Sequence, residues 1–348
     1  MRTSGALENI QRRKFLELLW AGALGLSVRG ALGDERPASK PFRGIFPIAQ
    51  TPFTESNQLD LDALAEEVRF INRCGAQGFV WPQNASEWMT LTERERLEGT
   101  EAIIAAGKNL RPAIVIGVQS PDTATAIRYA KHAEGAGADA IISLPQSEHS
   151  DPKSSLEYYK AVGGATRLPL FVQAVGNMTL DLIIELYQAI PNFRYLKDEA
   201  GNPLLRVAPL HARSADQLKI FSGGHGRDLL DEMRRGFSGS MPAASFADLY
   251  AQTWDLWHHD KRDEAMAMQG RTLLILTEMV GHGPECMKYI LYLRGVFKTY
   301  GIRKQPAAGS SLPTQLATGG DGTEMHLDQE GKQAIQQTLD YLKPYLRA

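Results

Sequence analysis

A lysine at the end of a short apolar stretch could act as a nucleophile. Phe193, Tyr195 and Leu196 lead into Lys197 without a helical period, and a turn containing Gly201 follows. Lysine is seldom fully buried unless it is paired or functional. A desolvated lysine is more readily deprotonated, and its free amine can form a Schiff base with a carbonyl compound. Taken alone, the stretch favours a simpler interpretation, a lysine at the water-exposed end of an ordinary strand.

The elements around this lysine change that interpretation. From residue 44, short apolar runs alternate with longer stretches of helical spacing. The expected strands are 44–50, 78–81, 113–117, 140–144, 168–174, 193–197, 219–222 and 236–241, and the expected helices are 61–72, 93–106, 124–134, 156–165, 180–190, 204–215 and 228–235. Continuous apolar strands, each followed by a helix, predict an α/β fold, the (β/α)8 TIM barrel. Chemistry in such barrels lies at the carboxyl ends of the strands, where Lys197 ends the sixth, so we expect a Schiff-base lysine.

The strand pattern stops after residue 245, and additional C-terminal helices follow. We expect helices at 249–268, 271–280, 284–298 and 329–347, with a loop at 302–324 that is rich in Gly, Ser, Pro and Thr. The domain interpretation is therefore an export signal and linker at 1–40, the barrel at 41–245 and a helical extension at 246–348.

Composition argues against several function classes. The chain has 348 residues, a net charge of -2 and 43% hydrophobic residues, so no surface for nucleic acid is indicated. The two cysteines are far apart, and the 8 histidines form no HExxH pattern. The cluster His258-His259-Asp260 lacks further ligands nearby and is interpreted as a solvated helix face. We therefore expect no metal site.

The first residues contain the features of a targeting segment in the expected order. Gln11-Arg12-Arg13-Lys14-Phe15-Leu16 resembles a twin-arginine export signal, and the apolar run 18–26 follows it. This run is shorter than the roughly 20 residues of a membrane span. The alternative is an amphipathic cytoplasmic helix with a chance arginine pair. We expect a periplasmic protein without a membrane segment in its mature form.

From about residue 42 to 300 the sequence resembles the family of dihydrodipicolinate synthase and N-acetylneuraminate lyase. The motifs that carry the resemblance are Thr51-Pro52-Phe53 after the first strand, Leu91-Thr92-x-Arg94-Glu95 after the second, Gly135-Ala136-Gly137-Ala138-Asp139 before the fourth, Leu196-Lys197-Asp198 with Gly201, and Ser222-Gly223-Gly224. The resemblance implies that Lys197 is the Schiff-base lysine, that no cofactor is needed, and that the protein is a homotetramer.

Two loops depart from the family pattern. The loop after the second strand usually reads Gly-Thr-Thr-Gly-Glu, and here Asn84 and Ala85 replace its two hydroxyl residues. An amide can still donate a hydrogen bond to a carboxylate. We expect Trp81 and Trp88 to bracket the pocket and either narrow it or offer a stacking surface. At the end of the fifth strand Gln173 adds another amide.

The expected substrate-binding residues are Asn84, Ala85 and Gln173, together with Met241 at the end of the eighth expected strand. The exchange of hydroxyl and aromatic groups for amides indicates a substrate different from that of dihydrodipicolinate synthase.

The family's proton-relay tyrosine is absent. Ser147 stands where it belongs, and we take Ser147 as a catalytic residue, although a serine hydroxyl is a poor relay without a neighbouring base. Glu148 or His149 could take over, since either titrates in a more useful range. Ordinary loop polarity explains these residues equally well.

The sequence thus predicts a lyase of the class I aldolase type, in which Lys197 attacks a 2-oxo acid such as pyruvate. A second hypothesis is a catalytically silent barrel that binds a small organic acid in the periplasm. The lost tyrosine and threonines favour this alternative, and the retained lysine opposes it.

Overall fold

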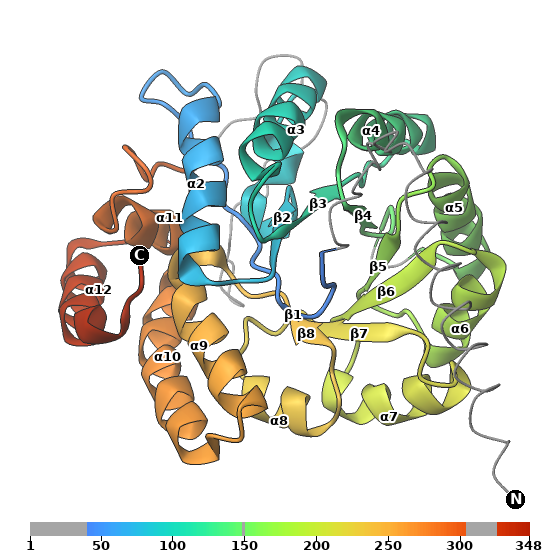
Figure 1. Ribbon diagram of the computed structural model, residues 1–348. Helices are drawn as coiled ribbons and strands as arrows, with labels where there is room; N and C mark the ends of the chain where they lie inside the picture. Colours follow the sequence, from blue (N-terminus) through green and yellow to red (C-terminus); the bar gives the residue numbers. More distant parts are fainter. Residues whose placement is uncertain (1–39, 148–149, 304–325) are drawn as a thin grey trace, which may run out of the picture. The chain divides into compact units, whose positions relative to one another are not determined.

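The computed structural model describes residues 40–147, 150–303 and 326–348, and the part from Lys40 onward forms one compact unit. The predicted export signal, the loop residues Glu148 and His149, and most of the predicted loop at 302–324 lie outside the described residues. Figure 1 shows a ring of strands surrounded by helices.

Eight parallel strands form one sheet in the order β1-β8-β7-β6-β5-β4-β3-β2. They are β1 (Gly44–Ile45), β2 (Gly78–Trp81), β3 (Ala113–Gly117), β4 (Ala140–Ser143), β5 (Leu170–Ala174), β6 (Phe193–Asp198), β7 (Lys219–Ser222) and β8 (Gly239–Ser240). A parallel bridge between Ile48 and Val80 joins the two ends of the sheet, so the barrel closes. The predicted TIM barrel is confirmed.

The first and last strands are shorter than predicted. The sequence pattern gave 44–50 and 236–241, whereas β1 and β8 have two residues each. Pro47 follows β1 closely and Pro242 follows β8. Proline has no N–H to donate to a ladder, so it limits both strands.

Helices follow the first seven strands and cover the outside of the barrel (Figure 1). They are α2 (Leu61–Cys74), α3 (Glu93–Gly107), α4 (Thr123–Ala136), α5 (Pro152–Gly164), α6 (Leu180–Ala189), α7 (Pro203–Arg213) and α8 (Leu229–Arg234). Five of them begin where a side chain accepts a backbone N–H of the first turn, from Asp60, Thr92, Asp122, Asp151 and Thr179. Such N-caps satisfy donors that the helix itself leaves unpaired.

Additional helices follow the barrel, as predicted, but their boundaries differ. They are α9 (Ala247–His258), α10 (Arg262–His282), α11 (Pro284–Leu293) and α12 (Gln329–Leu342). The predicted helix 249–268 is interrupted at Asp260, which has a φ of 60°. A left-handed residue ends a helix. Gly270, where the sequence pattern placed a break, lies inside α10. No helix in the described ranges is long and apolar enough to cross a bilayer.

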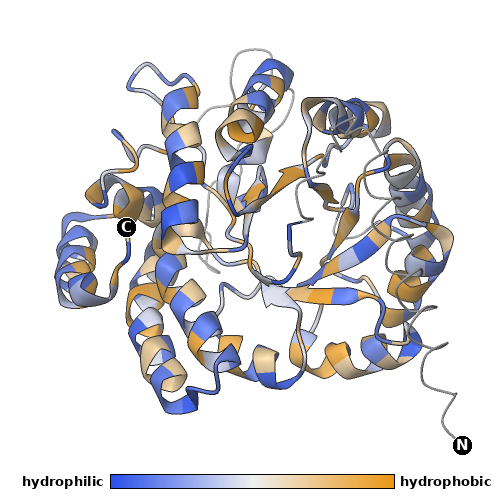
Figure 2. Ribbon diagram, viewed as in Figure 1, coloured by the Kyte–Doolittle hydropathy of each residue, from blue (hydrophilic) through white to orange (hydrophobic). Residues whose placement is uncertain are grey.

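Alternate strand residues form two separate apolar clusters. One cluster fills the barrel lumen and includes Phe46, Val80, Val115, Ile142, Phe171, Phe221 and Met241. The other lies between strands and helices and includes Trp81, Ile114, Ile141, Leu196 and Ile220. Figure 2 shows the corresponding apolar colour on strands such as β3 and β7. Because strand side chains alternate with a period of two, the position in the strand decides which residues face the lumen.

Candidate active site

Lys197 points into the lumen at the carboxyl end of β6. Its neighbour two residues earlier, Tyr195, packs against the lumen cluster, while Leu196 belongs to the outer cluster. Lys197 pairs in register with Gln173 of β5 on one side and with Phe221 of β7 on the other. The residue is 5% exposed. A buried lysine in the lumen needs a partner for its charge.

That partner is Glu199. The Lys197 Nζ lies 3.1 Å from Glu199 Oε2, and Gln173 Nε2 donates a hydrogen bond to the same oxygen. Sequence reasoning did not assign a role to Glu199. The signal was present: β6 ends at Asp198, but the Glu199 N–H still donates to the Ala174 carbonyl of β5, so the two-residue period extends to Glu199 and places it on the face of Lys197. Asp198 between them faces outward and receives a hydrogen bond of 2.8 Å from Arg206 Nε on α7.

Two more side-chain amides, those of Gln83 and Gln119, lie at the carboxyl end of β3. Gln83 Nε2 donates to Gln119 Oε1 over 3.0 Å, and Gln119 Nε2 donates to the Pro82 carbonyl over 2.8 Å. Both side chains lie over Gly117, where an added Cβ would be 1.9 Å from the Pro82 carbonyl oxygen. The absence of a side chain at Gly117 therefore makes room for this amide pair.

Some buried glutamine side chains have an amide oxygen without a hydrogen-bond partner. Within the described part of the chain, the buried Oε1 atoms of Gln50, Gln83 and Gln173 have no hydrogen-bond partner. Buried polar atoms are normally paired, by protein or by an ordered or bound molecule. Of these glutamines only Gln173 was predicted as a site residue; Gln50, Gln83 and Gln119 were not.

The other predicted site residues are divided between the lumen and the surface. Met241 is buried in the lumen cluster, and the half-buried Ala85 packs against the same cluster. Asn84 is exposed, and its Oδ1 accepts a hydrogen bond of 2.9 Å from Trp88 Nε1. Ser147 is also exposed, beyond the end of β4, and its backbone N–H donates to Ser150 Oγ over 3.1 Å.

The prediction that Trp81 borders the pocket is wrong. Trp81 is fully buried in the outer cluster, and its Nε1 donates to Thr51 Oγ1 over 2.9 Å. Val80 is the lumen residue of that strand, so its neighbour Trp81 must point toward the helices. Trp88 is half-buried, with its ring centroid 5.8 Å from the guanidinium of Arg96.

Arg96 holds the backbone at the end of β3. It is buried and donates hydrogen bonds to the carbonyls of Gly117 and Gln119, at 2.6 and 3.0 Å. Its guanidinium carbon lies 4.2 Å from the ring centroid of Tyr129, a cation–π contact. Burial lowers the pKa of Arg96 to about 10. The arginine therefore fixes the segment that carries the amide pair.

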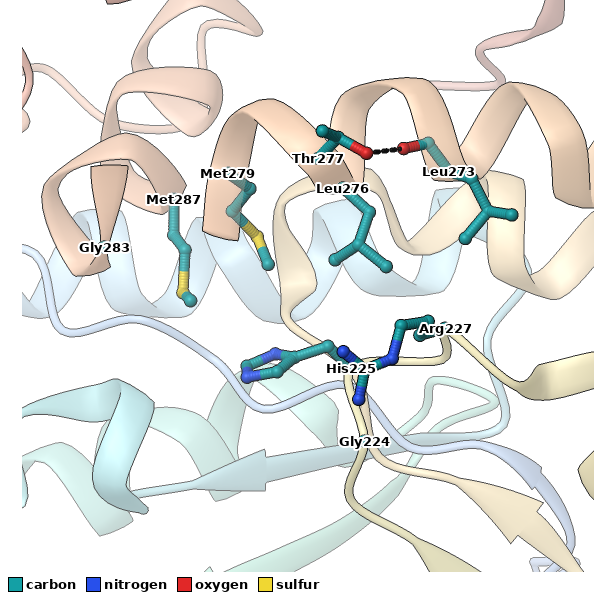
Figure 3. Close-up of a pocket in the computed structure, with 9 residues that line it drawn as sticks. All are labelled: Gly224, His225, Arg227, Leu273, Leu276, Thr277, Met279, Gly283 and Met287. Carbon is teal, nitrogen blue, oxygen red and sulfur yellow. Dashed lines mark hydrogen bonds between the residues drawn. The ribbon is translucent and has the colours of Figure 1, made fainter. Parts of the chain in front are cut away.

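A cavity of about 400 Å³ opens beside the loop after β7. In Figure 3 the apolar side chains of α10 and α11 face His225 and Arg227 across it. The lining residues are Gly224, His225, Arg227, Leu273, Leu276, Thr277, Met279, Gly283 and Met287. Burial, and then the charge of Lys197, lowers the pKa of His225, so this imidazole is predominantly neutral near pH 7. The cavity thus has apolar walls, a neutral imidazole and one cation, Arg227.

Potential metal ligands are not grouped in the described structure. No set of three or more His, Cys, Asp or Glu side chains that could hold a metal occurs in residues 40–147, 150–303 and 326–348. The two histidines of the sequence cluster each contact a carbonyl of α9, His258 that of Trp254 and His259 that of Asp255.

This chain is a (β/α)8 barrel in which a buried lysine at the carboxyl end of β6 pairs with a carboxylate. Barrels of this class place a lysine amine where it can act as a nucleophile. The chain belongs to the dihydrodipicolinate synthetase family, whose sequence profile matches residues 41–315. The resemblance recognised from the sequence motifs is confirmed.

Relatives of this chain carry two kinds of name. The chain is 26% identical over 194 residues to 4-hydroxy-tetrahydrodipicolinate synthase of Methanosarcina mazei, a match covering 54% of this chain and 65% of that enzyme. The matched part is slightly less than two thirds of the enzyme's length. This chain is also 25% identical over 234 residues to L-2-keto-3-deoxyarabonate dehydratase of Azospirillum brasilense, a match covering 65% of this chain and 75% of the relative.

Solved structures confirm the fold. The 4-hydroxy-tetrahydrodipicolinate synthase of Methylacidiphilum fumariolicum superposes with a TM-score of 0.74 at 21% identity, covering 88% of this chain and 97% of that one. Dihydrodipicolinate synthase of Rhodopseudomonas palustris gives 0.74 at 22% identity, covering 86% and 97%. At this identity the likeness concerns the fold.

Proposed function

We propose that the protein is a Schiff-base-forming lyase that acts on a 2-oxo acid through Lys197. The observation that carries the proposal is the buried Lys197 Nζ in the lumen, 3.1 Å from Glu199. A neutral amine at this place attacks the C2 carbonyl, and the resulting iminium accepts electrons when a bond at C3 is made or broken. Family membership supports this chemistry, because similar proteins carry the names of a synthase and a keto-acid dehydratase.

The lining of the lumen supports a polar substrate. The buried amides of Gln83, Gln119 and Gln173 offer donors and acceptors, and within the described chain the Oε1 atoms of Gln83 and Gln173 have no hydrogen-bond partner. Such groups match the carboxylate and hydroxyl groups of an oxygenated acid. Since the usual threonine pair and tyrosine are replaced, the substrate we propose differs from that of dihydrodipicolinate synthase.

Reductive trapping tests the proposal. The protein is incubated with pyruvate, 2-oxobutyrate, 2-oxoglutarate or a 2-keto-3-deoxy sugar acid, reduced with borohydride, and examined by intact and peptide mass spectrometry. We expect an adduct on Lys197 with the mass of the acid less one oxygen. Lys197→Arg should abolish it, whereas Lys219→Arg, at the exposed start of β7, should retain it. Thermal stabilisation by an acid without any adduct would instead support the silent binding barrel.

We further propose that the protein is exported to the periplasm through its twin-arginine segment and assembles as a homotetramer. The order of Arg12-Arg13, Phe15-Leu16 and the apolar run supports export. The resemblance to the family supports the tetramer.

A further inference from the structure

Several contacts hold the carboxylate of Glu199 next to the amine of Lys197. Its Oε2 contacts Lys197 Nζ at 3.1 Å and accepts a hydrogen bond from Gln173 Nε2. The backbone N–H of Glu199 donates to the Ala174 carbonyl over 2.9 Å, which continues the pairing with β5. The side chain is 27% exposed, compared with 6% for Lys197. Glu199 can therefore reach both the amine and a molecule that enters the lumen.

A glycine on the neighbouring strand end makes this position possible. An added Cβ at Gly223 would lie 2.2 Å from both Cδ and Oε1 of Glu199. Real Cβ atoms do not approach a heavy atom so closely, so any side chain at residue 223 would displace the carboxylate. The carboxylate therefore lies between the ends of β5 and β7, directly over the lysine strand.

Schiff-base chemistry needs a group that moves protons near the amine, and the family tyrosine is missing. Ser147, which stands in its place, is exposed beyond β4. Asp198 faces outward to Arg206. In the described part of the chain, Glu199 is the titratable side chain in contact with Lys197 Nζ. We propose that Glu199 is the proton-transfer residue of this site, a role that rests on the proposed Schiff-base function.

The first step balances with one carboxylate. Glu199 takes a proton from the Lys197 ammonium, and the neutral amine forms a C–N bond to C2 of the 2-oxo acid while the carbonyl π electrons go to oxygen. After proton transfer from nitrogen to that oxygen, the carbinolamine hydroxyl receives the proton held by Glu199 and leaves as water. The sum is ammonium plus ketone giving iminium plus water, with Glu199 again a carboxylate.

The same group serves the carbon step. Glu199 removes a proton from C3, and the C–H electrons form the enamine as the iminium π electrons move to nitrogen. Return of the proton from Glu199 to C3 restores the iminium. This cycle exchanges the C3 hydrogens of pyruvate with solvent and needs neither an oxidant nor a second substrate.

The test follows that exchange. Pyruvate is incubated in D2O with the wild-type protein and with Glu199→Gln, and loss of the C3 proton signal is recorded by NMR beside borohydride trapping. Proton transfer of this kind typically contributes about 10²–10⁴-fold in rate. We expect at least a 100-fold slower exchange in Glu199→Gln, while the adduct on Lys197 still accumulates on long incubation.

Two further measurements separate proton transfer from a structural role. Added formate should restore exchange in Glu199→Ala, in proportion to its concentration, and should not affect Lys197→Arg. Gly223→Ala, which retains Glu199 but displaces it, should slow exchange comparably. Its matched control is Gly164→Ala at the end of α5, where an added Cβ meets nothing within 4 Å.

The outcomes are distinguishable. If the wild type traps pyruvate on Lys197 and Glu199→Gln exchanges at the wild-type rate, the role of Glu199 is overturned and the lyase proposal stands. A wild type that forms no adduct with any of the acids overturns both proposals. Slow exchange in Glu199→Gln with formate rescue of Glu199→Ala supports both.

Discussion

At the scale of single residues, Glu232 of α8 links the stability of the fold to pH. It is buried, and it accepts a hydrogen bond from the hydroxyl of Ser222 at the end of β7. Burial raises the pKa of Glu232 from 4.5 to about 7; Asp228 and Asp231 add to the rise, and hydrogen bonds from Ser222 and Ser240 oppose it. The folded state therefore holds a proton that the unfolded chain releases at lower pH.

The sign of the effect follows from this difference. Below pH 4.5 the group is protonated in both states, and its favourable contribution to folding is fully present. As the pH rises through about 7 the folded protein must ionise a buried carboxyl, so the contribution is lost, on the order of 3 kcal/mol. We expect the melting temperature of the wild type to fall more steeply between pH 5 and pH 8 than that of Glu232→Gln.

Calorimetric melting across this pH range measures the effect, with Glu264→Gln on the exposed face of α10 as control. The control should follow the wild type. Parallel pH curves for the wild type and Glu232→Gln would show that Glu232 ionises normally in the folded protein.

The same scale shows how far sequence can predict a site. Lys197 was found because a lysine at the end of a barrel strand is exceptional. Glu199 was overlooked because it falls between the motif residues Asp198 and Gly201, although it lies two residues after Lys197 and contacts its amine. Trp81 was misplaced by ignoring the two-residue period of strand side chains. The pairing of Gln83 with Gln119 depends on the room over Gly117, which only coordinates reveal.

At the scale of elements, buried charges attach the C-terminal helices to the loop after β2. Lys288 of α11 is fully buried, forms an ion pair with Glu87, and donates to the Gly301 carbonyl over 3.0 Å. Desolvation lowers the pKa of Lys288, and desolvation likewise raises the pKa of the nearby buried Glu67. These charges stabilise the fold only as long as they remain paired.

Removing one partner should therefore be costly. We expect Lys288→Met to destabilise the protein by about 3–5 kcal/mol, because it leaves buried carboxylates without their cation. Denaturant unfolding of Lys288→Met, Glu87→Gln and the double variant gives the coupling, and the double variant should recover part of the loss. Lys298→Met, at an exposed position, is the control. Equal stability of Lys288→Met and Lys298→Met would contradict the anchoring role.

Element prediction succeeded where period and length were clear and failed at the ends. Eight strands and their helices followed from the alternation of apolar runs, but proline shortened β1 and β8. The boundary between α9 and α10 depends on the left-handed backbone at Asp260, a conformation that an aspartate adopts only occasionally and that no pattern of apolar residues indicates.

At the scale of the whole molecule, the compact unit from Lys40 onward follows, in the sequence, a segment that resembles an export signal. Twin-arginine export carries proteins that are already folded, so under the export proposal the arginine pair serves as an address. Replacing Arg12 and Arg13 together by lysine keeps the charge and removes the recognised residues. We expect the full-length precursor to stay in the cytoplasm, with its barrel folded and its melting temperature unchanged.

Cell fractionation and immunoblotting of a tagged protein measure the distribution, and the mass of the periplasmic form gives the cleavage site. The matched control replaces Arg2 and Arg29, two arginines outside the pair, by lysine and should be exported like the wild type. If the Arg12→Lys, Arg13→Lys protein reaches the periplasm as efficiently as the control, the pair is not the export signal. If the wild type itself stays in the cytoplasm, the 2-oxo acid must be sought among cytoplasmic metabolites. Retention of the pair variant alone would place the reaction proposed for Lys197 outside the cytoplasm.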